Sequence, residues 1–133
     1  MHATLLGERT LTEHDFTRLS KLMAGQLPPA LADVLGAAEV LRPREVPADI
    51  VTMYSQVELI DLHTRRRQTL TICYPGDSEP SAGFISVLSP VGSGVIGLRL
   101  GAVARWQTPG GEEGAAEVAA ILFQPEASGD FAL

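Results

Sequence analysis

The chain has 133 residues, of which 45% are hydrophobic, and its formal net charge is −6. This size and apolar content predict one compact domain with a small appendage, and the acidic balance argues against direct sequence-specific nucleic-acid binding, which rests on Lys and Arg. No run of 18 apolar residues and no basic-then-apolar leader occur, so we expect a cytoplasmic protein without membrane contact.

A first helix is expected over residues 13–24, after a loosely tied leader. Thr12 can cap it, with Asp15 at the third helical position, in a variant of the capping box. Apolar residues recur at i, i+3 and i+7 behind this start, and Gly25 is a plausible stop. The helix should therefore bury one apolar face.

A second helix is expected to start at Pro28 or Pro29 and to run to Leu41, where Arg42-Pro43 ends it. With the first helix it would form a short antiparallel hairpin. Each arm would be about 18 Å long, because each residue adds 1.5 Å over about twelve residues. We assign residues 1–44 to the leader and hairpin and residues 45–133 to a globular domain, since two prolines within 43–47 resist regular structure.

The globular part should contain a sheet. Four short β-prone runs follow the linker: Ile50–Met53, Gln56–Leu62, Gln68–Tyr74 and Phe84–Val87. The lone cysteine, Cys73, is read as a packed strand residue in a reducing compartment. Arg65-Arg66-Arg67 is the one basic cluster; it is either a solvated turn or a contact for an acidic partner surface.

A short helix is predicted to begin at Ser89, which can cap it, with Pro90 at the first helical position. Glycines along one side allow close packing, and Gly101 is the expected stop. Ala102–Gln107 and Glu117–Phe123 then read as a β-hairpin. The predicted fold class is α+β, with a twisted antiparallel sheet covered on one face by this helix.

The sequence shows no pattern typical of a catalytic, metal or cofactor site. His2, His14 and His63 have no metal-ligand spacing, and Gly92-Ser93-Gly94 lacks the rest of a phosphate loop. We read Trp106 as a partly buried strand anchor rather than a base-stacking platform, because a platform normally comes with a basic groove. We therefore expect a protein that is not an enzyme and needs no cofactor.

An ordered set of motifs carries a family resemblance. Ser89-Pro90-Val91-Gly92, Gly97-Leu98-Arg99-Leu100-Gly101, Pro109-Gly110-Gly111 and the ending Gln124-Pro125-Glu126-Ala127-Ser128-Gly129-Asp130-Phe131 stand in this order. The chain from Pro47 onward resembles the Rnk family, the regulators of nucleoside diphosphate kinase. More loosely, it is similar to the C-terminal domain of the Gre transcript-cleavage factors, which implies an FKBP-like fold.

The resemblance implies a transcription regulator that binds RNA polymerase near the secondary channel, competes there with Gre factors, and affects nucleoside diphosphate kinase levels indirectly. The matching motifs and the hairpin tip supply the candidate polymerase contacts: Gln26, Leu27, Pro28, Ser89, Pro90, Gly92, Arg99 and Gly101. In Gre factors, acidic residues at the tip of a long hairpin help hold a catalytic magnesium ion. The tip here, residues 24–29, has no carboxylate, so transcript cleavage is not expected.

Two points stay open at the level of the sequence. Ala102 stands where the resembling proteins carry Asp, and this change either weakens docking or alters only a turn. FKBP-like folds also include peptidyl-prolyl isomerases and peptide-binding chaperone modules, so an isomerase or chaperone is the alternative function. The isomerase pockets are lined by several aromatic side chains. This chain has only seven aromatic residues in all, which disfavours the isomerase alternative.

Overall fold

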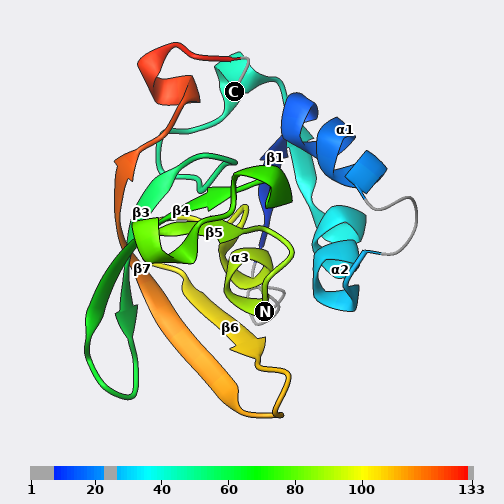
Figure 1. The fold of residues 1–133 in the computed structure, drawn as a ribbon. Coiled ribbons are helices and arrows are strands. Elements are labelled where there is room, and N and C mark those ends of the chain that lie inside the picture. Colours follow the sequence, from blue (N-terminus) through cyan, green and yellow to red (C-terminus); the bar gives the residue numbers. More distant parts are fainter. Residues whose placement is uncertain (1–7, 23–26, 132–133) are drawn as a thin grey trace.

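The computed structural model describes residues 8–22 and 27–131 (Figure 1). Its main feature is a five-stranded sheet in the order β5-β4-β3-β7-β6, accompanied by a two-stranded sheet of β1 and β2. The strands are β1 (Thr10–Thr12), β2 (Glu39–Leu41), β3 (Gln56–Asp61), β4 (Arg67–Cys73), β5 (Phe84–Ser86), β6 (Val103–Gln107) and β7 (Glu113–Phe123). The α-helices are α1 (Glu13–Lys21), α2 (Pro29–Ala37) and α3 (Pro90–Val95), and short 3-10 turns lie between the elements.

The N-terminal segment forms a strand-helix-helix-strand unit. Thr12 caps α1 as expected, with its Oγ1 accepting from the Asp15 N–H at 2.9 Å. The prediction that the second helix reaches Leu41 is wrong, because α2 ends at Ala37 and residues 39–41 pair with β1 in parallel. The apolar residues up to Leu41 recur at a helical spacing, but pairing with β1 holds residues 39–41 in a strand instead.

The two helices pack against the rest of the protein. Leu19 of α1 and Leu31 of α2 are fully buried and belong to the same hydrophobic core as Ile72 and other residues of the main sheet, and as Val51 in the loop before β3. The helical pair is therefore not a separate finger joined by a linker. The connection between the helices is described only for Leu22, Leu27 and Pro28, so the candidate contact Gln26 lies outside the described residues.

The main sheet is mixed rather than wholly antiparallel. β3 lies between β4 and β7 and pairs antiparallel with both, and β6 pairs antiparallel with β7. The prediction of a wholly antiparallel sheet is wrong for β5, which runs parallel to β4. Two 3-10 turns over residues 75–82 carry the chain back before β5 begins. The run Ile50–Met53 is also not a strand: Ile50 makes a single bridge to Arg99, and a turn follows.

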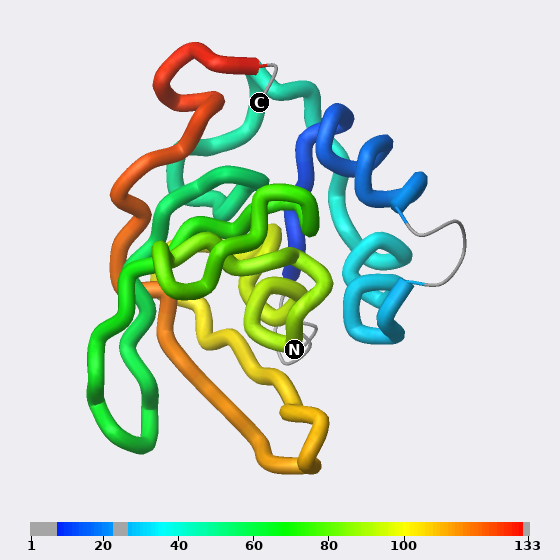
Figure 2. Tube along the Cα trace, in the orientation of Figure 1, coloured from blue at the N-terminus to red at the C-terminus, as the bar shows by residue number. Residues whose placement is uncertain are grey.

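α3 is shorter than expected. It has six residues and ends at Val95, just before Gly97, whose φ is +81°, instead of running on to Gly101. The closing hairpin is present as predicted, although β7 starts at Glu113 instead of Glu117. The C-terminal segment then lies beside residues 44–50 (Figure 2), where the Gln124 Nε2 donates to the carbonyls of Pro47 and Ile50, both at 2.8 Å.

The sheet has one covered and one open face. Val57 and Leu59 of β3 are buried, whereas Gln56, Glu58 and their neighbours across the strands project to the other side. α3 lies on the covered side (Figure 1), near Leu59. None of the described helices has the length and apolar character needed to cross a bilayer.

Candidate partner-binding site

The first turn of α3 is built by a small hydrogen-bond network. The Ser89 Oγ accepts from the Gly92 N–H at 3.0 Å and donates to the Ser86 carbonyl at 2.7 Å. Gly92 is buried against the backbone: a Cβ there would lie 2.2 Å from the Ser86 oxygen. Within the motif Ser-Pro-Val-Gly, the serine thus caps the helix and the glycine lets it pack tightly against the chain before it.

Arg9 fixes the other end of α3, which sequence reasoning missed. Its Nη1 donates to the carbonyls of Ser93 at 3.2 Å and Ile96 at 2.8 Å. These carbonyls lie at and just beyond the C-terminal end of the helix, where a cation is favourable. Burial lowers the pKa of the Arg9 guanidinium. In the sequence, Arg9 is only a basic residue just before a strand, and such residues are too common to indicate a contact with a helix end.

A hollow opens between the start of α2, α3 and β6. Its volume is about 350 Å³, and it brings together two candidate contacts that are far apart in sequence, Pro28 and Pro90. The lining residues are Arg9, Pro28, Pro29, Ala30, Leu88, Pro90, Ser93, Gly94, Arg105, Trp106 and Gln107. Its walls combine proline rings, an indole and cationic side chains, which suits a protein partner better than a small polar substrate. We call it the α3 hollow.

The remaining candidate contacts lie outside the α3 hollow. Leu27 is half-buried and packs against the core. The Arg99 side chain is 62% exposed and forms an ion pair with Asp49, with 3.4 Å between Nε and Oδ2. Gly101 has a φ of +90° and donates its N–H to the Val118 carbonyl at 2.8 Å. Next to it, Leu100 and Val103 are exposed apolar residues.

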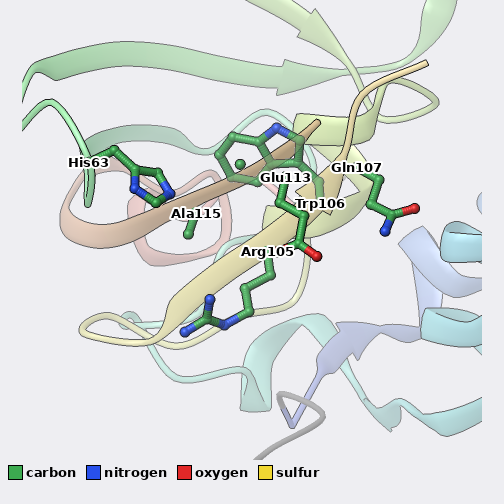
Figure 3. Close-up of a pocket in the computed structure, with 7 residues that line it drawn as sticks. His63, Arg105, Trp106, Gln107, Glu113 and Ala115 are labelled. Carbon is green, nitrogen blue, oxygen red and sulfur yellow. The ribbon is translucent and has the colours of Figure 1, made fainter. Parts of the chain in front are cut away.

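Trp106 is the partly buried strand anchor that the sequence predicts. Its indole lies on Gly114, where a Cβ would come within 2.3 to 2.6 Å of the ring. It borders the α3 hollow and a second hollow of about 350 Å³ near His63, Arg105 and Glu113 (Figure 3). The contact with Gly94 of α3 makes the indole the link between the hairpin and the helix.

A family model described as "Transcription elongation factor, GreA/GreB, C-term" matches residues 46–123. The chain belongs to the GreA/GreB family. The regulator of nucleoside diphosphate kinase from Escherichia coli K12 is 38% identical over 107 residues, which cover 77% of this chain and 79% of that protein. The resemblance to the Rnk family is thereby confirmed.

Two further relatives support this assignment within the family. The transcription elongation factor GreA from Desulfotalea psychrophila is 40% identical over 81 residues, which cover 61% of this chain and 50% of that protein. A solved GreA/GreB elongation factor from Nitrosomonas europaea has a TM-score of 0.71 and 32% sequence identity, and the match covers 87% of this chain and 98% of that one. The α+β architecture is therefore shared with a Gre-family protein.

Sequence reasoning also missed a buried acidic contact between α1 and the body of this Gre-family protein. Asp15 is 1% exposed, and its Oδ2 accepts from the Met53 N–H at 3.1 Å. Burial is the main cause that raises the pKa of this carboxyl to about 7. Glu126 approaches the same loop and accepts from the Thr52 Oγ1 at 2.6 Å, and burial raises its pKa too.

The carboxylates of the described residues are not arranged as a metal centre. No three side chains of His, Cys, Asp or Glu within residues 8–22 and 27–131 are grouped to hold an ion. Asp33 lies exposed on α2, and Glu39, expected on the second helix, lies instead in β2. The described surface features around α3 and Trp106 include two hollows that the indole borders.

Proposed function

We propose that this protein is a non-catalytic transcription regulator that binds RNA polymerase near the secondary channel and competes there with Gre factors. Family membership supports a role in transcription. The α3 hollow has the mixed apolar and cationic character of protein interfaces, and Leu100 and Val103 outside it are exposed apolar side chains.

The shape of the N-terminal unit carries the proposal. α1 and α2 have nine residues each, which corresponds to about 14 Å per helix, and both bury leucines in the core. A Gre factor, as the resemblance implies, needs a long acidic-tipped hairpin to place a magnesium ion in the polymerase. This protein has a body suited to the same docking place and lacks the reach for that chemistry.

An effect on nucleoside diphosphate kinase would be indirect. The name of the Escherichia coli relative supplies the connection, and transcription is the step through which a polymerase-bound regulator would act. The glycines of α3 serve close packing against Ser86 and Trp106 rather than phosphate binding.

The proposal is tested by measuring binding to core polymerase. The test variant reverses the charge at Arg99. Two exposed ion pairs of equal length make a matched comparison: Arg99–Asp49 and Arg42–Glu45, both 3.4 Å. Such pairs contribute little to folding, so both variants should fold. We expect R99E to bind polymerase at least about tenfold more weakly, and R42E to bind as the wild type does.

Two outcomes would reject the proposal, one in this binding experiment and one in a separate isomerisation assay. The first is no binding of the wild-type protein at micromolar concentrations. The second is catalysis in a proline-peptide isomerisation assay, which would favour the isomerase alternative; the regulator should leave the uncatalysed rate unchanged. Equal weakening by R99E and R42E would move the docking surface away from Arg99.

A further inference from the structure

The open face of the sheet, opposite α3, carries a row of side chains across four strands. Phe84 of β5 is paired with Thr71 of β4, Thr71 with Gln56 of β3, and Gln56 with Phe123 of β7. Neighbouring strands are about 4.8 Å apart, so the row spans about 15 Å. Its two ends are exposed aromatic rings: Phe84 is 38% exposed and Phe123 41%.

Tyr54 completes a hollow over this row. The hollow has a volume of about 450 Å³ and is lined by Tyr54, Gln56, Thr71, Phe84 and Phe123, so three of the seven aromatic residues of the chain converge there. We call it the aromatic hollow. The Gln56 amide and the Thr71 hydroxyl make no side-chain hydrogen bond with any described residue, which leaves polar groups free on its floor.

The backbone of Tyr54 is strained, and neighbouring residues hold its ring in place. Its φ is +66°, a left-handed conformation that costs a bulky residue free energy. The Tyr54 N–H donates to the Ile72 carbonyl at 2.6 Å, its hydroxyl donates to the Asp77 carboxylate, and its ring lies 5.8 Å from that of Tyr74. These contacts hold the ring at the rim of the hollow before any ligand arrives.

The rim of the aromatic hollow is acidic. Asp77 is held by Tyr54, and Glu79 lies directly opposite Phe84 in an antiparallel bridge, which places the two side chains on the same face. No Lys or Arg occurs from Gln68 to Leu98. Arg18 of α1 acts electrostatically on Tyr54, and its guanidinium is already stacked on the Tyr74 ring. Arg67 is on the same face and is already paired with Glu58 at 2.8 Å.

We propose that the aromatic hollow binds a basic peptide segment by enclosing an Arg or Lys side chain. Aromatic faces attract cations, and the two rim carboxylates add charge complementarity. The protein already uses this contact internally: the Arg18 guanidinium lies 4.0 Å from the Tyr74 ring centroid, and Arg44 lies 5.1 Å from that of Phe131. This site is on the face away from α3 and is independent of the polymerase proposal.

NMR titration of the full chain with acetyl-Gly-Arg-Gly-amide tests this site. The matched probe is the same peptide with citrulline, which keeps the shape of Arg without its charge. We expect the Arg peptide alone to shift the side-chain resonances of Tyr54, Phe84 and Phe123, and we expect 0.5 M salt to weaken binding only in part, because ring contacts are not screened as exposed ion pairs are.

Two variants and a control locate the binding energy. F123A and E79Q should each weaken the Arg peptide about threefold, the effect of one exposed cation–π or charge contact. E112Q, which removes a carboxylate from the exposed β6–β7 turn, should leave the affinity unchanged. Phe123 and Glu79 lie at the surface, so both variants should stay folded, which urea denaturation checks.

Three results would overturn the inference. Equal shifts with the citrulline peptide would mean that the hollow recognises apolar shape rather than a cation. Equal loss of affinity in E112Q would mean general attraction to an acidic protein. Concentration-dependent dimerisation that shifts the same three aromatic residues would assign the face to a second copy of the chain.

Discussion

Asp15 joins α1 to the body of the molecule through a buried hydrogen bond to the Met53 N–H. The pKa of Asp15 is about 7 in the folded protein, against an ordinary value of 3.8. Between these two pH values the folded protein keeps the carboxyl proton that the unfolded chain has lost. A carboxyl whose pKa is raised on folding contributes its full stabilisation below about pH 4. That stability is lost as pH rises towards 7, by up to about 4 kcal/mol for three pKa units.

The variant D15N tests this linkage between the pKa of Asp15 and stability. In the wild type, the free energy of unfolding should fall between pH 4 and 7 and level off above about pH 7. In D15N, which keeps an acceptor for the Met53 N–H, more than half of this fall should disappear. Urea denaturation at a series of pH values measures both, and E126Q is the control for the neighbouring carboxyl, whose pKa is also raised. An unchanged slope in D15N would show that Asp15 is not the titrating group.

Glycines at two positions in helices should respond oppositely to alanine. A Cβ at Gly92 in α3 would lie 2.2 Å from the Ser86 oxygen, whereas nothing lies within 4 Å of a Cβ at Gly36 in α2. G92A should therefore destabilise the protein by about 2 kcal/mol or more through overpacking. G36A should stabilise it by about 0.5 kcal/mol, because alanine restricts the unfolded chain. Thermal unfolding distinguishes the two, and equal effects would contradict the packing described for α3.

At the scale of elements, the β6–β7 hairpin can be followed by its indole, since Trp106 is the single tryptophan. A Cβ at Gly114 would overlap the ring, so G114A should push the indole outwards and shift its fluorescence emission to longer wavelength. Gly110, in the turn of the same hairpin, has only the Thr108 hydroxyl near its Cβ position, at 3.9 Å, and G110A should leave the emission unchanged. An unshifted spectrum in G114A would argue against the ring lying on Gly114.

Elements marked by local chemistry could be predicted from the sequence. The caps at Thr12 and Ser89 and the turn of the last hairpin depend on neighbouring residues, and the structure has them where expected. The strand at residues 39–41 and the parallel placement of β5 could not be predicted, because each depends on a partner strand remote in sequence. The same limit applies to the candidate site. Only tertiary packing brings Pro28 and Pro90 to one hollow and places the Asp15 carboxylate beside the Met53 N–H.

One hydrophobic core unites the N-terminal helices with the sheet across the protein. The acidic charge is distributed unevenly over this body, with Glu112, Glu113, Glu117, Glu126 and Asp130 in the last 22 residues and no Lys or Arg among them. Short helices packed into the core are consistent with the proposed role of occupying a site on a larger enzyme.

The most direct measurement is transcript cleavage in arrested elongation complexes with magnesium, with a Gre factor present and increasing amounts of this protein. We predict no cleavage by this protein alone and a progressive loss of the cleavage that the Gre factor stimulates, weaker with R99E than with R42E. Shortened transcripts produced by this protein alone, or Gre-stimulated cleavage that stays unchanged at saturating concentration, would contradict the account.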